Sequence, residues 1–171
     1  MYPQMELLET KHCLLRPITL DDAEDLFEYY SIPKVVKYLP IKVHQNISET
    51  RRFLKSYFIN NYQKGKVGHY AVVLKGQGKV IGNVGFNNIS PYAKSGEMGI
   101  CINPNYWGHN LSYELAEVLV NYAFNKLNLD YVYAITYDDN IYSKSPLIQL
   151  RFTYEYNFNK KIKNLNNKIV K

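Results

Sequence analysis

The stretch INPNYWGHNLSYELAEVLVNYAF, residues 102–124, constrains the fold of this chain more than any other segment. It begins with residues typical of a strand, turns at Pro104, and passes the single tryptophan, Trp107, and Gly108. Apolar residues then recur every three or four positions, which predicts an amphipathic helix over about 111–127. The N–H groups in the first turn of a helix lack intrahelical partners and carry partial positive charge. The turn therefore predicts a binding site for phosphate oxygens, such as those of a diphosphate; alternatively, Gly108 serves only the close packing of strand and helix.

Hydrophobic periodicity predicts further elements on both sides of this stretch. Two runs of β-forming residues flank Gly-Gln-Gly, which predicts a hairpin over 70–86. Thr19 and Ser48 are suitable N-caps for helices over 19–30 and about 49–62. The other predicted elements are strands over 12–17, 95–103, 130–140 and 152–158, and an imperfect helix over 140–152 that contains Pro146. We expect one α/β (α+β) domain, with helices on a mixed sheet and a right-handed parallel crossover between residues 97 and 137.

The charge of the chain is concentrated at its C-terminal end. Five lysines after Glu155 account for +5 of the formal net charge of +6, and the body carries +1. A basic tail on a near-neutral body is typically solvated, so we do not expect a nucleic-acid partner. A reading in which the tail contacts RNA ranks last, because the sequence has no recognised RNA-binding motif.

Two further features concern the compartment of the protein. No apolar run approaches the roughly 18 residues of a membrane span, and no signal peptide is evident, which favours a cytoplasmic protein without a membrane partner. Cys13 and Cys101 lack CxxC spacing, and we expect both to be reduced and buried. The four histidines show no metal-ligand spacing, so no metal is predicted.

The blocks GEMGICINPNYWGHNLSYELAEVLVNYAF and LNLDYVYAITYDDNIYS resemble the GNAT superfamily of acetyl-CoA-dependent N-acetyltransferases, in particular its RimJ/RimL-like branch. LLRPITLDDAEDLFEYY and KYLP are similar to the same family, and the resemblance covers most of residues 6–155. It implies a GNAT fold, with a mixed, mostly antiparallel sheet, helices on both faces, and a splayed parallel pair at the cofactor cleft. It also implies a single acetyltransferase domain over residues 1–158, followed by a basic tail over 159–171.

The resemblance implies a binding site for acetyl-CoA around the turn. Asn110 and Ser112 stand where the family commonly has Gly, or Gly and Ala, and Asn is the non-glycine residue that best tolerates a positive φ. Backbone N–H groups between Gly99 and Ile102 are expected to receive the thioester oxygen. The implied cofactor-binding residues are Ile100, Cys101, Ile102, Trp107, Gly108, His109, Asn110, Leu111, Ser112, Tyr113 and Asn140.

The acetyl acceptor should be a primary amine, either a protein N-terminus or a small-molecule amine. Glu97 matches an acidic position of the family and is the candidate general base; alternatively it is a solvated carboxylate beside Lys94. Ser143 is the candidate proton donor to the leaving thiolate; alternatively it caps a helix. Leu147 stands where many GNAT enzymes have a tyrosine acid.

Two further residues are candidates for the acceptor site. Tyr38 occupies a position that shapes this site in relatives. His69 precedes a predicted strand and either lines the acceptor pocket or lies in an exposed loop. Direct transfer in a ternary complex is the expected reaction, and a non-catalytic acyl-CoA-binding protein is the alternative.

The resemblance weakens near the C-terminus. Arg151 stands where relatives have a glycine, so we expect no left-handed cap after the last helix. Residues 162–171 are short and charged, and are a poor substitute for the long strand that normally completes the sheet. We therefore expect the final strand to be short or missing, and the exposed sheet edge to be covered in a homodimer.

Overall fold

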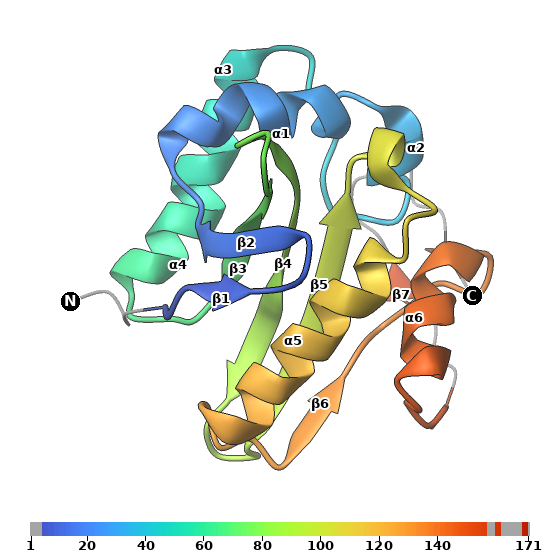
Figure 1. Ribbon diagram of the computed structural model, residues 1–171. Coiled ribbons are helices and arrows are strands. Elements are labelled where there is room, and N and C mark those ends of the chain that lie inside the picture. Colours follow the sequence, from blue (N-terminus) through green and yellow to red (C-terminus); the bar gives the residue numbers. More distant parts are fainter. Residues whose placement is uncertain (1–4, 157–159, 162–168, 171) are drawn as a thin grey trace.

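The computed structural model describes residues 5–156, 160–161 and 169–170 (Figure 1). Six strands form the main sheet in the order β1-β2-β3-β4-β5-β6. Neighbouring strands are antiparallel except for β5 and β6, which pair in parallel. The strands are β1 Leu8–Glu9, β2 Cys13–Pro17, β3 His69–Leu74, β4 Val80–Ser90, β5 Ser95–Ile102 and β6 Tyr131–Tyr133.

Helices connect these strands and confirm most of the predicted segments. Thr19 precedes the 3-10 turn Leu20–Asp22 as its N-cap, and α1 follows directly. The second predicted helix begins earlier than expected, because Asn46 and not Ser48 is its cap; Asn46 Oδ1 accepts from Glu49 N at 3.0 Å. The helices are α1 Ala23–Tyr30, α2 Pro33–Val36, α3 Ile47–Phe53, a π-helical turn Leu54–Ile59, α4 Asn60–Gln63, the 3-10 turn Pro104–Tyr106, α5 Leu111–Asn125 and α6 Ile141–Gln149.

Helices cover both faces of the sheet, as predicted. Tyr29 and Tyr30 of α1 donate hydrogen bonds to Asn83 of β4. The next residue along β4, Val84, pairs with Tyr70 of β3, whose ring packs edge-on against Tyr122 of α5. Since successive residues of a strand face opposite sides, α1 and α5 lie on opposite faces. Fully buried side chains on the two faces include Leu15, Leu26, Ile81, Leu115 and Leu119.

The parallel pair β5–β6 is short. The two strands pair only at Ser95–Tyr131, Gly96–Val132 and Glu97–Tyr133, whereas β5 continues to Ile102. The predicted strand over 130–140 is therefore limited to Tyr131–Tyr133. The two segments separate beyond Glu97 and Tyr133, which is the splayed arrangement expected at the cleft.

The C-terminal strand predicted over 152–158 is wrong for residues 152–156, which form no strand. Residues 157 and 158 lie outside the described residues. Lys160–Lys161 (β7) and Ile169–Val170 (β8) pair antiparallel with each other in a separate two-stranded sheet. Within the described part of the chain, the main sheet thus ends at β6.

Two other sequence features have definite outcomes. Cys13 and Cys101 are free and buried, as expected. Among the helices whose structure is described, none combines the length and apolarity needed to cross a membrane.

Helix α6 ends with a left-handed residue, contrary to the sequence prediction. Arg151 has a φ of 60°. Phe152 N donates to Leu147 O at 2.9 Å and Arg151 N donates to Ile148 O at 3.0 Å, the bond pattern of a Schellman cap. These two bonds and the adjacent Phe152 impose the conformation although a Cβ atom disfavours it.

Replacing Arg151 with glycine should therefore stabilise the protein. Arg151→Gly removes a steric penalty of about 1 kcal/mol and should raise Tm by about 2–4 °C in thermal unfolding. Arg151→Ala is the matched control, because alanine keeps the Cβ atom and should give no such gain. Equal melting temperatures for the two variants would contradict this account of the cap.

Candidate active site

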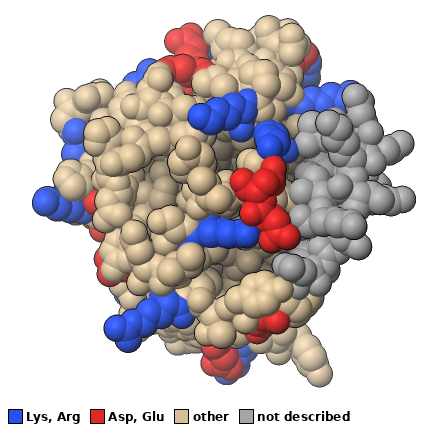
Figure 2. Space-filling model, turned by 90° about the vertical axis from the view of Figure 1, so that its right-hand side faces the viewer, with Lys and Arg blue, Asp and Glu red and all other residues tan. Residues whose placement is uncertain are grey.

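A cavity of about 1000 Å³ opens where β5 and β6 separate. Residues 97–102 of β5 line one side, and residues 134–137 after β6 line another. Residues of α1, α2, α6 and the π-helical turn are among the others that line it. Lys37 Nζ lies 2.9 Å from Asp139 Oδ2 and so links α2 to the loop before α6. Figure 2 shows this side of the molecule, where basic and acidic side chains lie directly beside one another.

The structure brings most of the predicted site residues to this cavity. Ten of them line it: Tyr38, His69, Glu97, Ile100, Cys101, Ile102, Trp107, Ser112, Asn140 and Ser143. The other five are not among its lining residues and lie at the start of α5: Gly108, His109, Asn110, Leu111 and Tyr113. Of these, Leu111 is buried in the core, and the Tyr113 hydroxyl donates to Glu117 Oε1 at 3.0 Å. His109 and Asn110 are exposed beside the turn.

The turn before α5 has the geometry that the sequence predicted. Gly108 has a φ of 85°, and a Cβ atom there would meet no atom within 4 Å. Asn110, the N-cap of α5, is left-handed at φ 58°, and no side chain caps the helix. Glu114 N donates to Asn110 O at 3.3 Å, so the amides before Glu114 are those that a helix leaves without intrahelical partners. This end of α5 can receive an anion.

Trp107 connects the turn before α5 to the sheet through a hydrogen bond. Its Nε1–H donates to Ile102 O, the last residue of β5, at 2.8 Å. The Lys34 ammonium lies 4.6 Å from the centre of the indole ring. The indole thus holds the start of α5 against the end of the strand that lines the cavity.

Glu97 lies half-buried in the cavity. Its Oε1 accepts a hydrogen bond from Asn87 Nδ2 at 3.0 Å. The alternative pairing with Lys94 is not found, because Lys94 Nζ lies 3.7 Å from Asp130 Oδ2. Burial, and after it the Glu97 carboxylate, raises the pKa of the Tyr57 and Tyr133 hydroxyls. Glu97 therefore lies among aromatic side chains, where an ammonium group could bind.

His69 is not in an exposed loop; it is the first residue of β3 and only 6% exposed. Burial lowers the pKa of its imidazole to about 4, so the ring is neutral at pH 7. Its Nε2 lies 2.8 Å from Asn87 Oδ1. Because Asn87 also bonds to Glu97, Asn87 links His69 to Glu97 through hydrogen bonds. Asn87 and Asn83 were not predicted from the sequence, because their only signal is polarity within the β-forming run IGNVGFNN.

Ser143 and Asn140 lie at the start of α6. Asn140 is the residue before the helix, and Ser143 N donates to Asn140 O at 3.3 Å. The reading of Ser143 as a helix cap is therefore wrong, and so is the reading of Asn140 as a strand end, because β6 ends at Tyr133. Leu147 also lines the cavity, so no phenol stands at that position. Burial raises the pKa of the Cys101 thiol to about 12, which disfavours a thiolate nucleophile.

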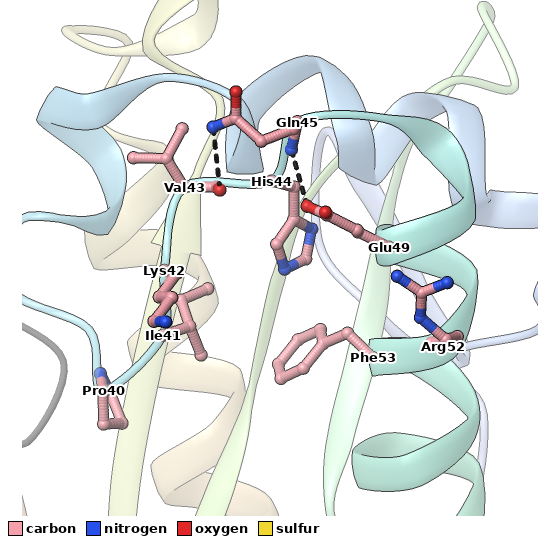
Figure 3. Close-up of a pocket in the computed structure, with 9 residues that line it drawn as sticks. All are labelled: Pro40, Ile41, Lys42, Val43, His44, Gln45, Glu49, Arg52 and Phe53. Carbon is pink, nitrogen blue, oxygen red and sulfur yellow. Dashed lines mark hydrogen bonds between the residues drawn. The ribbon is translucent and has the colours of Figure 1, made fainter.

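A second groove of about 690 Å³ runs beside the cavity (Figure 3). Segment 40–45 forms one wall, and Glu49, Arg52 and Phe53 of α3 form the other. Gln45 N donates to Glu49 Oε2 at 2.7 Å and joins the two walls. Pro40, Ile41 and Phe53 line both the groove and the cavity, so the two spaces are adjoining.

Comparisons with known proteins agree with this geometry. The model of the acetyltransferase (GNAT) domain matches residues 12–153. An uncharacterized N-acetyltransferase, p20 of Bacillus licheniformis, is 32% identical over 152 residues, which cover 88% of this chain and 84% of p20. The crystal structure of a GNAT-family acetyltransferase from Bacillus anthracis superposes with a TM-score of 0.82 at 24% identity, covering 96% and 93% of the two chains.

A second solved structure of similar fold contains a bound ligand. RimL, a ribosomal L7/L12 alpha-N-protein acetyltransferase solved in complex with coenzyme A, has a TM-score of 0.80 at 19% identity, with 96% of this chain and 93% of RimL covered. At such identities these two structures share the fold with this chain. The domain match and the similarity to p20 show that the chain belongs to the GNAT family of acetyltransferases, with RimL-type enzymes among its structural neighbours.

Proposed function

We propose that the protein transfers an acetyl group from acetyl-CoA to a primary amine in a ternary complex. One observation carries the proposal: Ser112, in the uncapped first turn of α5, and Glu97 line one cavity beside β5. The start of α5 can receive a diphosphate, and the Glu97 carboxylate can receive an ammonium group. The coenzyme A bound by the structural neighbour RimL supports the choice of acyl donor.

The donor would extend along the unpaired edge of β5. Its diphosphate would bind the backbone N–H groups near Gly108 to Ser112, with the Ser112 hydroxyl as a further donor. Its amide-containing arm would follow β5 toward Asn140 and Ser143. The thioester oxygen would then lie near the N–H groups of residues 99–102, which could stabilise the developing negative charge.

The proposed chemistry begins with the acceptor. At pH 7 only about one Lys-type amine in 2,500 is unprotonated, against roughly one α-amine in seven. Glu97 accepts a proton from the ammonium, and the free amine attacks the thioester carbon. The C–S bond breaks and the thiolate takes a proton from Ser143. The second proton that leaves nitrogen reaches Ser143 through solvent in the same step, so no free alkoxide forms, and Glu97 then releases its proton to solvent.

Direct transfer fits this site better than an acetylated enzyme. Cys101 is the cysteine of the cavity, and it is 9% exposed with a raised thiol pKa. Acetyl-cysteine trapped at Cys101 and detected by mass spectrometry would refute direct transfer. The acceptor would enter past Tyr38 and His69, and either a protein N-terminus or a small amine suits the proposal. A single domain over 1–158, a basic tail over 159–171 and a homodimer covering β6 remain predictions.

Adding negative charge to the start of α5 should weaken coenzyme A binding. Ser112→Asp places a carboxylate beside the proposed diphosphate site and should raise the Kd at least about tenfold in calorimetry. The free variant should melt no lower than wild type, since an acid in the first turn favours a helix. Ser48→Asp is the matched control, because Ser48 occupies the same helical position in α3. Unchanged affinity in Ser112→Asp would remove the diphosphate site.

Removing the carboxylate of Glu97 should impair transfer without affecting donor binding. With a Lys-type acceptor at pH 7, Glu97→Gln should lower kcat/KM by about 100-fold or more. The deficit should narrow above pH 9, where the amine is increasingly unprotonated in solution. Thiol release from acetyl-CoA measures the rate, and Glu24→Gln on the exposed side of α1 is the control. Binding of coenzyme A without turnover on any amine would favour a non-catalytic protein.

A further inference from the structure

A series of buried polar side chains runs through the sheet toward Glu97. Asn83 of β4 is 3% exposed and His69 of β3 is 6% exposed, which is uncommon for polar residues. The hydroxyls of Tyr29 and Tyr30 lie 2.9 Å and 2.8 Å from Asn83 Oδ1. Asn83 Nδ2 lies 3.0 Å from His69 Nδ1. Every member of this buried cluster has a partner, so the cluster can adopt a defined arrangement.

The series continues from the core to the cavity. His69 Nε2 lies 2.8 Å from Asn87 Oδ1, and Asn87 Nδ2 lies 3.0 Å from Glu97 Oε1. The three residues come from β3, β4 and β5, which are neighbours in the sheet. A continuous hydrogen-bonded path therefore joins α1 to the candidate base.

An ionised carboxylate only accepts hydrogen bonds, so Glu97 fixes the direction of the bonds in the series, and Asn87 must present its NH₂ group to it. Burial raises the pKa of the Tyr29 and Tyr30 hydroxyls well above its usual value, so both stay protonated and donate to Asn83 Oδ1. With its oxygen so placed, Asn83 presents its NH₂ group to His69 Nδ1, which must accept. A neutral imidazole has one N–H, and it is then on Nε2.

The same reasoning sets the orientation of the next amide. The Nε2–H of His69 donates to the oxygen of Asn87, so the NH₂ group of Asn87 points to Glu97. An isolated exposed asparagine could present either end of its amide to a neighbour. Here the carboxylate, which can only accept, and the hydroxyls of α1, which can donate, are compatible with one orientation of the groups between them.

Two backbone features allow Asn87 to reach Glu97. The β4–β5 pairing passes from Phe86–Met98 to Asn88–Glu97, so Asn87 is the extra residue of a β-bulge. A Cβ atom on Gly99 would lie 3.0 Å from both Oδ1 and Nδ2 of Asn87. The bulge redirects the side chain, and Gly99 leaves the space in which its amide lies against β5.

We propose that Asn83, His69 and Asn87 form a positioning relay that holds Glu97 toward the acceptor amine. The proposal rests on the role of Glu97 as the base. Asn87 donates a charge-assisted hydrogen bond to Glu97 Oε1. Among the described residues, no protein donor bonds to Glu97 Oε2. Oε2 is therefore the oxygen that faces the substrate. Tyr57 and Tyr133 are the titratable groups that face Glu97 from the π-helical turn and from β6.

Two substitutions of Asn87 distinguish its bond to His69 from its bond to Glu97. Asn87→Asp can still accept from His69 but cannot donate to Glu97, and it adds a second carboxylate there. Asn87→Ala can do neither. Asn87 is exposed enough for both variants to fold, and Asn121→Asp on the exposed side of α5 is the charge-matched control.

The kinetic expectation is a loss of rate together with a changed pH profile. Asn87→Ala should lower kcat by about 10- to 100-fold, through misplacement of the base, with the KM for acetyl-CoA within about twofold. Asn87→Asp should move the acidic limb of the kcat/KM profile upward by about one pH unit, because a like charge disfavours ionised Glu97. A purely structural role would lower Tm and leave the profile in place. A kcat within about twofold of wild type in Asn87→Ala would overturn the relay.

Nuclear magnetic resonance tests the relay without turnover. Nitrogen-15 shifts of His69 in the wild-type protein should show a protonated Nε2 and an unprotonated Nδ1. The Glu97 carboxyl carbon should titrate at a different pH in the two Asn87 variants than in wild type and Asn121→Asp. If wild type acetylates no amine but both signals behave as stated, the proposed function fails and the relay stands. Protonation on Nδ1, or an unchanged Glu97 titration, would refute the relay even in an active enzyme.

Discussion

The parallel pairing of β5 with β6 stops at Glu97 and Tyr133, and the rest of the site depends on where it stops. Had it continued in the same register, residues 134–137 would have paired with residues 98–101 of β5. Instead both segments line a cavity of about 1000 Å³. Buried backbone N–H and C=O groups need partners, so this edge favours a ligand that carries amides and can lie along a strand. The arm of coenzyme A has that chemistry, and the start of α5 lies where such a ligand would leave the strand.

The alternation of side chains along β5 would place the two proposed substrates on different faces of the sheet. Ile100 pairs with Val84, which lies on the α5 face, whereas Glu97, Gly99 and Cys101 share the opposite face with Asn83. The carboxylate therefore projects toward α1 and the π-helical turn, the side on which the groove of Figure 3 adjoins the cavity. Donor and acceptor would approach from opposite faces of the sheet and meet where the strands part. This topology would allow the ternary complex that we propose.

Short sequence patterns correctly predicted the elements whose conformation depends on neighbouring residues. The sequence predicted the turn at Gly108, the hairpin around Gly76 and Gly78, and helix α5. Positive φ angles and helical periodicity depend on a few adjacent residues, so they can be recognised locally. The choice of Asn46 over Ser48 as a cap was missed because two good capping residues stand two positions apart. Arg151 was missed for a different reason, since two backbone bonds of the Schellman cap outweigh the preference of its residue type.

Long-range contacts explain most of what the sequence left undetermined at the site. Ten of the proposed residues line the cavity, because the family pattern locates the strand and the turn. Asn83 and Asn87 were not predicted as site residues. Asn83 bonds to tyrosines of α1 that lie 53 and 54 residues away in the sequence, and Asn87 reaches Glu97 because of a β-bulge. Nothing near them in the sequence distinguishes a buried asparagine from one in a turn.

The polar cluster behind Glu97 is not explained by stability alone. Replacing both partners of a buried hydrogen bond by apolar groups of similar shape is often neutral or stabilising. Phenylalanine at positions 29 and 30 with an apolar residue at 83 could therefore fill the same space between α1 and β4. Such a core would remove the Asn83 donor to His69 Nδ1, so the proton of His69 would no longer be held on Nε2 as the donor to Asn87. Directional bonds are what the polar core adds, and they end at the carboxylate that faces the cleft.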